Sequence, residues 1–269
     1  MSHQNTVPES TAKAHDVEQI RKHLGDEFSS RLHYFASIES TNAWLQGEIG
    51  APSGTVCLTD FQSRGRGRRG RSWLAPPGSS IMFSVLNKFT RVDLSGLSLA
   101  LGARLAQTLI LNGAERVGLK WPNDLIIGDQ KMGGILVEQS SAGTIMGAGI
   151  NFRIPEEFMD NQIQWTDIST HYPAMDRDWL AASLIEATLN CLRDFENSGF
   201  TDFIRDWEGL HQYDSREVNV LTGSVRRTGT VIGLAADGAL KIQIDGRIEN
   251  VYAADVSIRL AQGESENGV

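Results

Sequence analysis

The octet RGRGRRGR, residues 64–71, contains five arginines in a chain of 269 residues whose formal net charge is −8. The residues before it, TVCLTDFQ at 55–62, follow a strand pattern, and SIMFSVLNKF at 80–89 predicts a second strand after it. A loop between two strands differs from the strand-to-helix turn of a P-loop or a dinucleotide-binding motif, and its glycine spacing matches neither. We therefore expect residues 64–71, the arginine loop, to connect two strands of a folded sheet.

The composition around this loop is that of an ordinary globular protein. Hydrophobic residues make up 41% and charged residues 22% of the chain, which disfavours disorder. The sequence pI near 5.3 disfavours a protein whose whole surface binds nucleic acid. Two cysteines without metal-ligand spacing are typical of a reducing compartment, and neither a secretion signal nor a membrane-spanning run is present. We therefore expect a cytoplasmic protein with no membrane partner.

The arginine loop has the chemistry of an anion site. Its glycines allow positive φ and close approach of the backbone to a ligand. Guanidinium groups match the geometry of phosphates and carboxylates. A disordered nucleic-acid tether is the alternative, but the run is short, unrepeated and placed between two strands. The pattern favours a small anionic ligand.

Two glycine-rich strands follow downstream. In TIMGAGIN, residues 144–151, a period of two places Gly147, Gly149 and Asn151 on one face, and the large apolar residues on the other. In KMGGILVE, residues 131–138, a glycine pair also weakens the strand interior, which suggests that something packs against the backbone. A bulge or a crowded strand crossing is the alternative. The pattern predicts a floor without side chains beneath a ligand.

The hydrophobic patterns of the remaining sequence divide the chain into four regions. Apolar periodicity predicts helices over 94–113, with Asp93 as its cap, and over 177–199. After Tyr213 the pattern changes to about five short strands broken by glycine, which is typical of a small barrel. We expect a flexible N-terminus at 1–15, a catalytic domain at 16–212, a barrel at 213–262 and a tail at 263–269.

Five motifs occur in a characteristic order: SerThrAsn at 40–42, DFQSRGRGRRGRSW at 60–73, KWPND at 120–124, KMGGILVE at 131–138 and GAGIN at 147–151. Together they resemble the biotin–protein ligases, which activate biotin as its adenylate and transfer it to a carrier lysine. The resemblance implies an α+β fold, in which a mixed β-sheet flanked by helices, similar to class II aminoacyl-tRNA synthetases, precedes a small SH3-like β-barrel. It also implies ATP and biotin as substrates, Mg²⁺, and the biotin carboxyl carrier domain of a carboxylase as partner.

The resemblance also assigns residues. The ureido ring of biotin is an amide-like donor and acceptor, which suits hydroxyl and carboxamide side chains. The implied biotin contacts are Ser40, Thr41, Asn42, Gln62, Gly65, Arg66, Gly67, Arg68, Lys131, Gly134, Gly147 and Gly149. The implied ATP and adenylate contacts are Arg66, Arg68, Arg71, Trp73, Lys120, Asn123, Asp124, Lys131 and Asn151. Lys131, Arg68 and Lys120 are the catalytic candidates, and Asp124 is the candidate for Mg²⁺.

Two other functions compete with this interpretation. A lipoate-type protein ligase shares the fold and the adenylation chemistry, but the glycine floor and the GRGRRG string favour biotin. A nucleic-acid-binding regulator would use the arginine loop differently. Some relatives carry an N-terminal winged helix-turn-helix that binds an operator, and the short segment before the catalytic region leads us to expect the form without it, and no DNA binding. The sequence is compatible with a monomer or a homodimer.

Overall fold

The computed structural model describes residues 13–90, 93–158, 165–222, 225–253 and 256–261. The predicted tail at 263–269 and most of the predicted flexible N-terminus lie outside these ranges. None of the helices in the described part of the chain is long and apolar enough to cross a membrane.

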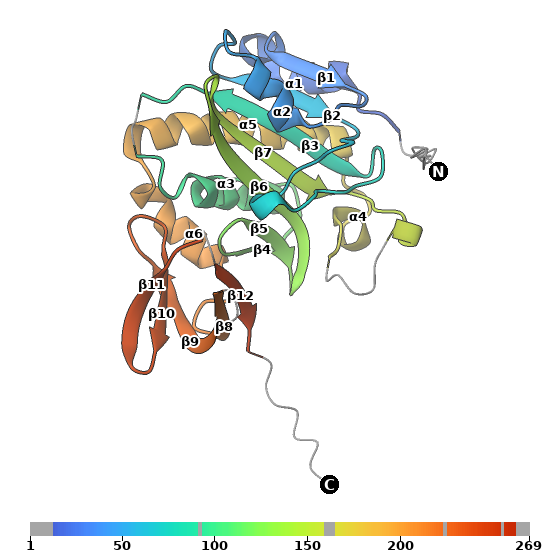
Figure 1. Cartoon of the computed structure of the whole chain (residues 1–269). Coiled ribbons are helices and arrows are strands. Elements are labelled where there is room, and N and C mark those ends of the chain that lie inside the picture. The colour runs from blue at the N-terminus through green and yellow to red at the C-terminus, as the bar shows by residue number, and fades with distance from the viewer. Residues whose placement is uncertain (1–12, 91–92, 159–164, 223–224, 254–255, 262–269) are drawn as a thin grey trace, which may run out of the picture.

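The larger region is built on a seven-stranded sheet in the order β1-β2-β3-β7-β6-β5-β4 (Figure 1). Only the β1–β2 pairing is parallel among these neighbours, so the sheet is mixed. Its strands are β1 (Leu32–Phe35), β2 (Thr55–Thr59), β3 (Ser80–Asn87), β4 (Val117–Lys120), β5 (Asp124–Ile127), β6 (Gln130–Ser140) and β7 (Gly143–Asn151). Tight turns join β5 to β6 and β6 to β7 in antiparallel hairpins.

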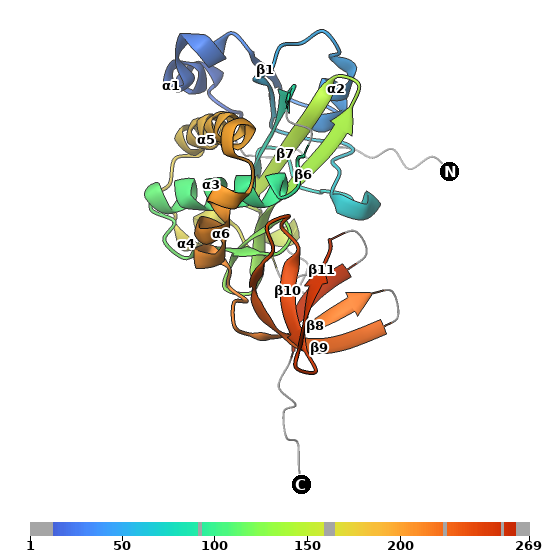
Figure 2. The ribbon, with the colours of Figure 1, turned by 90° about the vertical axis from the view of Figure 1, so that its left-hand side faces the viewer.

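Helices cover the two faces of this sheet unequally. Three of them, α1, α3 and α5, form a layer on one face, while the short α2 lies on the other face (Figure 2). The main core fills the space between the sheet and the three-helix layer, and a smaller cluster lies under α2. The helices are α1 (Val17–Ser29), α2 (Thr41–Gly47), α3 (Leu97–Leu111), α4 (Ile168–His171), α5 (Arg177–Ser198) and α6 (Ile204–Leu210), with short 3-10 turns at Arg68–Gly70, Glu156–Phe158 and Thr201–Phe203.

The start of α3 differs from the prediction. The helix begins at Leu97, and its N-cap Gly96 has a φ of +77°, in the left-handed region that favours glycine. Asp93 accepts a hydrogen bond from the Ser95 amide instead of capping the helix. A Cβ at Gly96 would lie 2.2 Å from the Phe200 ring. The Phe200 ring therefore requires glycine at the N-cap of this helix, which has no side-chain cap.

The N-terminal boundary also differs from the prediction. His15, which the sequence assigns to the flexible N-terminus, is only 6% exposed. Its backbone amide donates to the Asp60 carboxylate, and its ring lies 2.5 Å from an Asp178 oxygen. The folded domain therefore includes His15, because buried partners hold it on both sides.

The C-terminal region is a five-stranded antiparallel sheet in the order β11-β10-β9-β8-β12, which has the strand content that the sequence predicts. Its strands are β8 (Glu217–Thr222), β9 (Val225–Leu234), β10 (Leu240–Ile244), β11 (Arg247–Val251) and β12 (Val256–Leu260). It packs below the larger sheet, beside α6 (Figure 2). The Trp121 indole donates to the Gly238 carbonyl at 3.1 Å and joins the two regions.

Candidate active site

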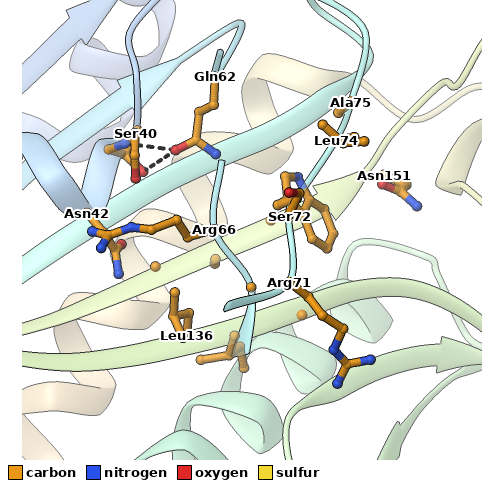
Figure 3. Close-up of a pocket in the computed structure, with 18 of the residues that line it drawn as sticks. Ser40, Asn42, Gln62, Arg66, Arg71, Ser72, Leu74, Ala75, Leu136 and Asn151 are labelled. Atoms are coloured by element: carbon orange, nitrogen blue, oxygen red, sulfur yellow. Dashed lines mark hydrogen bonds between the residues drawn. The ribbon is translucent and has the colours of Figure 1, made fainter. Parts of the chain in front are cut away.

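A cavity of about 770 Å³ opens on the face of the sheet that carries α2. This volume is within the usual range of ligand pockets, about 300–1,000 Å³. Strands β6 and β7 form its floor, and the chain from Phe61 to Pro77, which includes the arginine loop, crosses over it (Figure 3). The predicted residues that line it are Ser40, Thr41, Asn42, Gln62, Arg66, Gly67, Arg68, Arg71, Trp73, Asn123, Asp124, Lys131, Gly134, Gly147, Gly149 and Asn151.

One end of the cavity is a network of hydroxyls and carboxamides. Ser40 is the N-cap of α2, so the helix start directs its neighbours toward the cavity. The Thr41 amide and hydroxyl donate to Gln62 Oε1 at 2.8 and 3.1 Å. The Ser84 hydroxyl donates to Asn42 Oδ1 at 2.5 Å. These partners fix the orientation of each polar group before a ligand arrives.

The floor is backbone, as the period-two pattern predicts. A Cβ at Gly147 would lie 2.4 Å from Asn42 Oδ1. A Cβ at Gly149 would lie 2.7 Å from the indole of Trp73. Trp73 thus rests on the floor, and its Nε1–H is buried without a hydrogen-bond partner among the described residues. The two glycines are required because side chains from α2 and the loop occupy the space above them.

Lys131 carries the cation at the other end. Its Nζ lies 2.5 Å from Asp124 Oδ1, across the β5–β6 pair. Gly134 faces Asp124 in the strand register, and a Cβ there would lie 3.2 Å from Lys131 Nζ. Gly134 therefore makes room for the ammonium group, which Asp124 holds in one place, whereas a Cβ at Gly133 would lie 2.9 Å from the Gly149 carbonyl.

The loop arginines have separate anchors. Arg66 contacts Glu138 at 3.4 Å and Gln46 at 3.2 Å, both beyond the polar end of the cavity. Arg68 donates to Asn123 Oδ1 at 3.0 Å and to the Ala253 carbonyl of the C-terminal region at 2.7 Å. Burial, with repulsion from Arg69, lowers the pKa of Arg68, and Asp124 opposes this effect. Because arginine ordinarily titrates far above neutral pH, Arg68 stays charged.

Two predicted residues are not part of the cavity lining. Gly65 closes the loop instead: its carbonyl accepts from the Trp73 amide, and a Cβ there would lie 2.4 Å from the Trp73 carbonyl. Lys120 extends over the ring of Tyr213, with Nζ 5.3 Å from the ring centre. Burial lowers the pKa of Lys120, partly offset by Asp124. Packing within the loop keeps Gly65 out of the cavity lining, and the ring of Tyr213 holds the Lys120 side chain away from it.

The sequence reasoning missed several lining residues. Trp165 is the most informative, because it pairs with Lys131 in an isolated bridge and its Nε1–H is buried without a partner in the described part of the chain. No local pattern marks this tryptophan, and only the pairing brings it to the cavity. The other lining residues not predicted are Phe61, Ser63, Ser72, Leu74, Ala75, Pro76, Pro77, Phe83, Ile135, Leu136, Ala148 and Phe158.

The described residues contain no cluster of three or more metal-ligating side chains. Asp124 is the carboxylate in the cavity lining, and one of its oxygens is paired with Lys131. Mg²⁺ usually retains water and binds through one or two carboxylates together with substrate phosphates. A single carboxylate fits that role for a phosphate-bound Mg²⁺, but not for a site made by the protein alone.

The fold and cavity define a site for a compact molecule that presents amide-like groups at one end and negative charge at the other. Comparison with known proteins identifies families that match both regions of the chain. The sequence model of the Biotin/lipoate A/B protein ligase family matches residues 34–154, and that of the Biotin protein ligase C terminal domain matches residues 216–259.

Individual proteins extend this match. The bifunctional ligase/repressor BirA of Escherichia coli is 36% identical over 235 residues, which cover 84% of this chain and 73% of that protein. The biotin–[acetyl-CoA-carboxylase] ligase of Mycobacterium tuberculosis is 30% identical over 248 residues, 84% of this chain and 88% of that protein. The biotin protein ligase of Aquifex aeolicus, solved in complex with biotin and ATP, superposes with a TM-score of 0.76 at 29% identity, covering 86% of this chain and 99% of that one. The chain therefore belongs to the biotin protein ligase family, and the predicted fold is confirmed.

Proposed function

We propose that this protein is an ATP-dependent ligase that activates biotin as biotinyl-5'-AMP and transfers the biotinyl group to a lysine of a biotin carboxyl carrier protein. The observation that carries the proposal is the polarity of one cavity, which has Thr41, Asn42 and Gln62 at one end and Lys131 and Arg68 at the other. Family membership supports the same activity.

The first step is the activation of a carboxylate. A carboxylate oxygen of biotin attacks the α-phosphorus of ATP, a P–O bond breaks, and pyrophosphate leaves. In this proposal the ammonium of Lys131 lies between the biotin carboxylate and the α-phosphate, and Arg68 neutralises charge that develops on the phosphates. Cations placed before the reaction stabilise the transition state because they need no reorganisation.

The polar end holds the head group of biotin. Hydroxyl and carboxamide groups whose own partners are fixed offer donors and acceptors at defined positions. The glycine floor lets Asn42 and Trp73 pack directly against β7, which leaves room above them for the ligand. The Nε1–H groups of Trp73 and Trp165 are buried without a hydrogen-bond partner among the described residues, so they are candidates for adenylate contacts.

Asp124 would hold Mg²⁺ together with phosphate oxygens of ATP, and the ion would supply charge neutralisation on the leaving group. Lys120 is not assigned a direct role, since its ammonium lies over Tyr213.

The second step transfers the acyl group. A neutral lysine amine of the carrier attacks the carbonyl carbon of the adenylate, an amide bond forms, AMP leaves, and the amine loses a proton. The adenylate is a mixed anhydride that water hydrolyses, so the chain from Phe61 to Pro77 must exclude water between the two steps.

We also propose a cytoplasmic location, no DNA binding, and a monomer or homodimer.

Biotin-dependent exchange of pyrophosphate into ATP tests this function, with lipoate as the parallel substrate. We expect exchange with biotin and little with lipoate. Exchange with lipoate alone would favour the lipoate-type ligase, which the family description also includes. Exchange with neither, together with retention of duplex DNA in filter binding, would favour the regulator.

A further inference from the structure

A buried ionic cluster lies behind the cavity, at the start of α5. The side chains of Arg177, Asp60 and His15 are 10%, 8% and 0% exposed. None of the three lines the cavity. Buried charges are costly unless they are paired and hydrogen-bonded. Arg177 and Asp60 are paired here, whereas His15 Nε2 is buried without a hydrogen-bond partner among the described residues.

Arg177 joins the two ends of the chain segment that crosses the cavity. Its Nη1 donates to the Gly78 carbonyl at 2.6 Å, and its Nη2 contacts Asp60 Oδ1 at 3.3 Å. The Gly78 amide donates back to the Asp60 carbonyl at 2.9 Å. Asp60 and Gly78 are the residues immediately before and after 61–77, so one guanidinium holds both ends of this segment.

The N-terminal segment completes the cluster. The Lys13 carbonyl accepts from Arg177 Nη2 at 2.7 Å, and the His15 amide donates to Asp60 Oδ1 at 3.2 Å. The Tyr34 hydroxyl donates to the other Asp60 oxygen. The Asp60 carboxylate is therefore held by the N-terminal segment, β1 and α5 at once.

In the middle of the same segment, Arg68 donates to Asn123 and to the Ala253 carbonyl, whereas the contact of Arg66 is weaker. Arg66 meets Glu138 with side chains that are 42% and 25% exposed, and such partly solvated pairs contribute little. Fixed ends favour a loop that closes, because they reduce the entropy lost on closure.

We propose that Arg177 is a positioning residue for the adenylate: it fixes the ends of residues 61–77 so that the arginine loop closes in one register over the cavity. This inference rests on the proposed function for its substrate, but its structural part concerns the loop alone.

Trypsin cleaves after arginine, so the rate of tryptic cleavage within residues 64–71 measures how often the arginine loop opens. We would compare Arg177→Lys, which keeps the charge but cannot reach all three acceptors, with Arg193→Lys. Arg193 lies on the same helix in an exposed pair with Glu27 at 3.8 Å, so it is a matched control. Cleavage within 64–71, relative to all other tryptic sites, would be followed by mass spectrometry on the full-length protein.

For Arg177→Lys we expect this relative cleavage rate to rise about tenfold, the effect of losing a charge-assisted hydrogen bond on an opening equilibrium. We also expect bound adenylate to be released faster by a similar factor, with the KM for biotin less affected. Arg193→Lys should match the unchanged protein in both measurements. If Arg177→Lys is not recovered folded, Asp60→Asn takes its place, because it keeps an acceptor but removes the charge. The test is again the rate of cleavage within 64–71 relative to all other tryptic sites.

An unchanged relative cleavage rate, or an equal increase at every tryptic site, would overturn the proposal, since the second result indicates general destabilisation. Faster cleavage within 64–71 with unchanged adenylate release would also overturn it. If the unchanged protein shows no biotin-dependent exchange, the proposed function fails separately, and the cleavage ratio without ligand still tests the role of Arg177 in the loop.

Discussion

Replacing Gly147 by alanine tests the glycine floor most directly. The added methyl carbon would lie 2.4 Å from Asn42 Oδ1, about 1 Å closer than a normal contact of this kind. Asn42 is 4% exposed, donates to Glu138 at 2.8 Å and accepts from Ser84 at 2.5 Å. It cannot move away without straining both hydrogen bonds.

Each of these hydrogen bonds has a net value of about 0.5–1.5 kcal/mol, so the loss is about 1–3 kcal/mol. If that cost falls on the ligand-binding arrangement of Asn42, the Kd for biotin rises by about 5- to 150-fold. We expect the KM for ATP to change much less, because the contact lies at the polar end. Calorimetric titration with biotin and the substrate dependence of pyrophosphate exchange would measure both.

Gly209→Ala is the matched control, since a Cβ there meets nothing within 4 Å and the residue lies inside α6. It should leave biotin affinity unchanged and slightly raise stability. A folded Gly147→Ala protein with an unaltered biotin Kd would refute the reasoning that Asn42 and the floor form one binding surface.

Three further perturbations test other parts of the site and fold. Lys131→Ala should suppress adenylate formation because it removes the cation paired with Asp124, and a near-normal burst of pyrophosphate would rule that role out. Arg68→Gly should release adenylate more than it slows its formation, which a trapping assay with excess unlabelled biotin measures; unchanged retention would contradict this. Burial lowers the pKa of His211 to about 4 from its ordinary 6.5. The unfolded state therefore binds the proton first as pH falls from about 6.5 to about 4, and stability should decrease over that window by up to about 3 kcal/mol and no further below it. His211→Gln should lose this part of the pH dependence in urea unfolding, and equal slopes in both proteins would exclude the effect.

The elements that the sequence predicted correctly are those whose deciding residues lie close together in the chain. The alternation in TIMGAGIN was enough to place Gly147, Gly149 and Asn151 on one face, because a strand has a fixed period of two. α5 also begins at Arg177 as predicted, since Asp176 caps it and its apolar stripe is regular. The strand count of the C-terminal region followed from its glycine-broken runs.

Other features depend on partners that are distant in sequence. The Phe200 ring requires glycine at the N-cap of α3, and Trp165 reaches the cavity by pairing with Lys131. The direction of Lys120 depends on Tyr213, which follows α6. The cluster around Arg177 joins residues of the N-terminal segment, β1, the two ends of residues 61–77 and α5, and no motif links them. Motif order located the cavity, but only tertiary contacts decide which of the motif side chains enter it.

The backbone floor has a consequence for ligand chemistry. A side chain under a ligand can rotate to admit an extra substituent, whereas a strand hydrogen-bonded on both edges cannot. Analogues of biotin enlarged on the surface that lies against β7 should therefore be rejected whatever their affinity for the polar end. Analogues enlarged toward residues 61–77 meet a loop segment instead of a strand that is hydrogen-bonded on both edges. Tolerance to modified vitamins should be one-sided, and a panel of paired regioisomers would map which side of the vitamin meets the sheet.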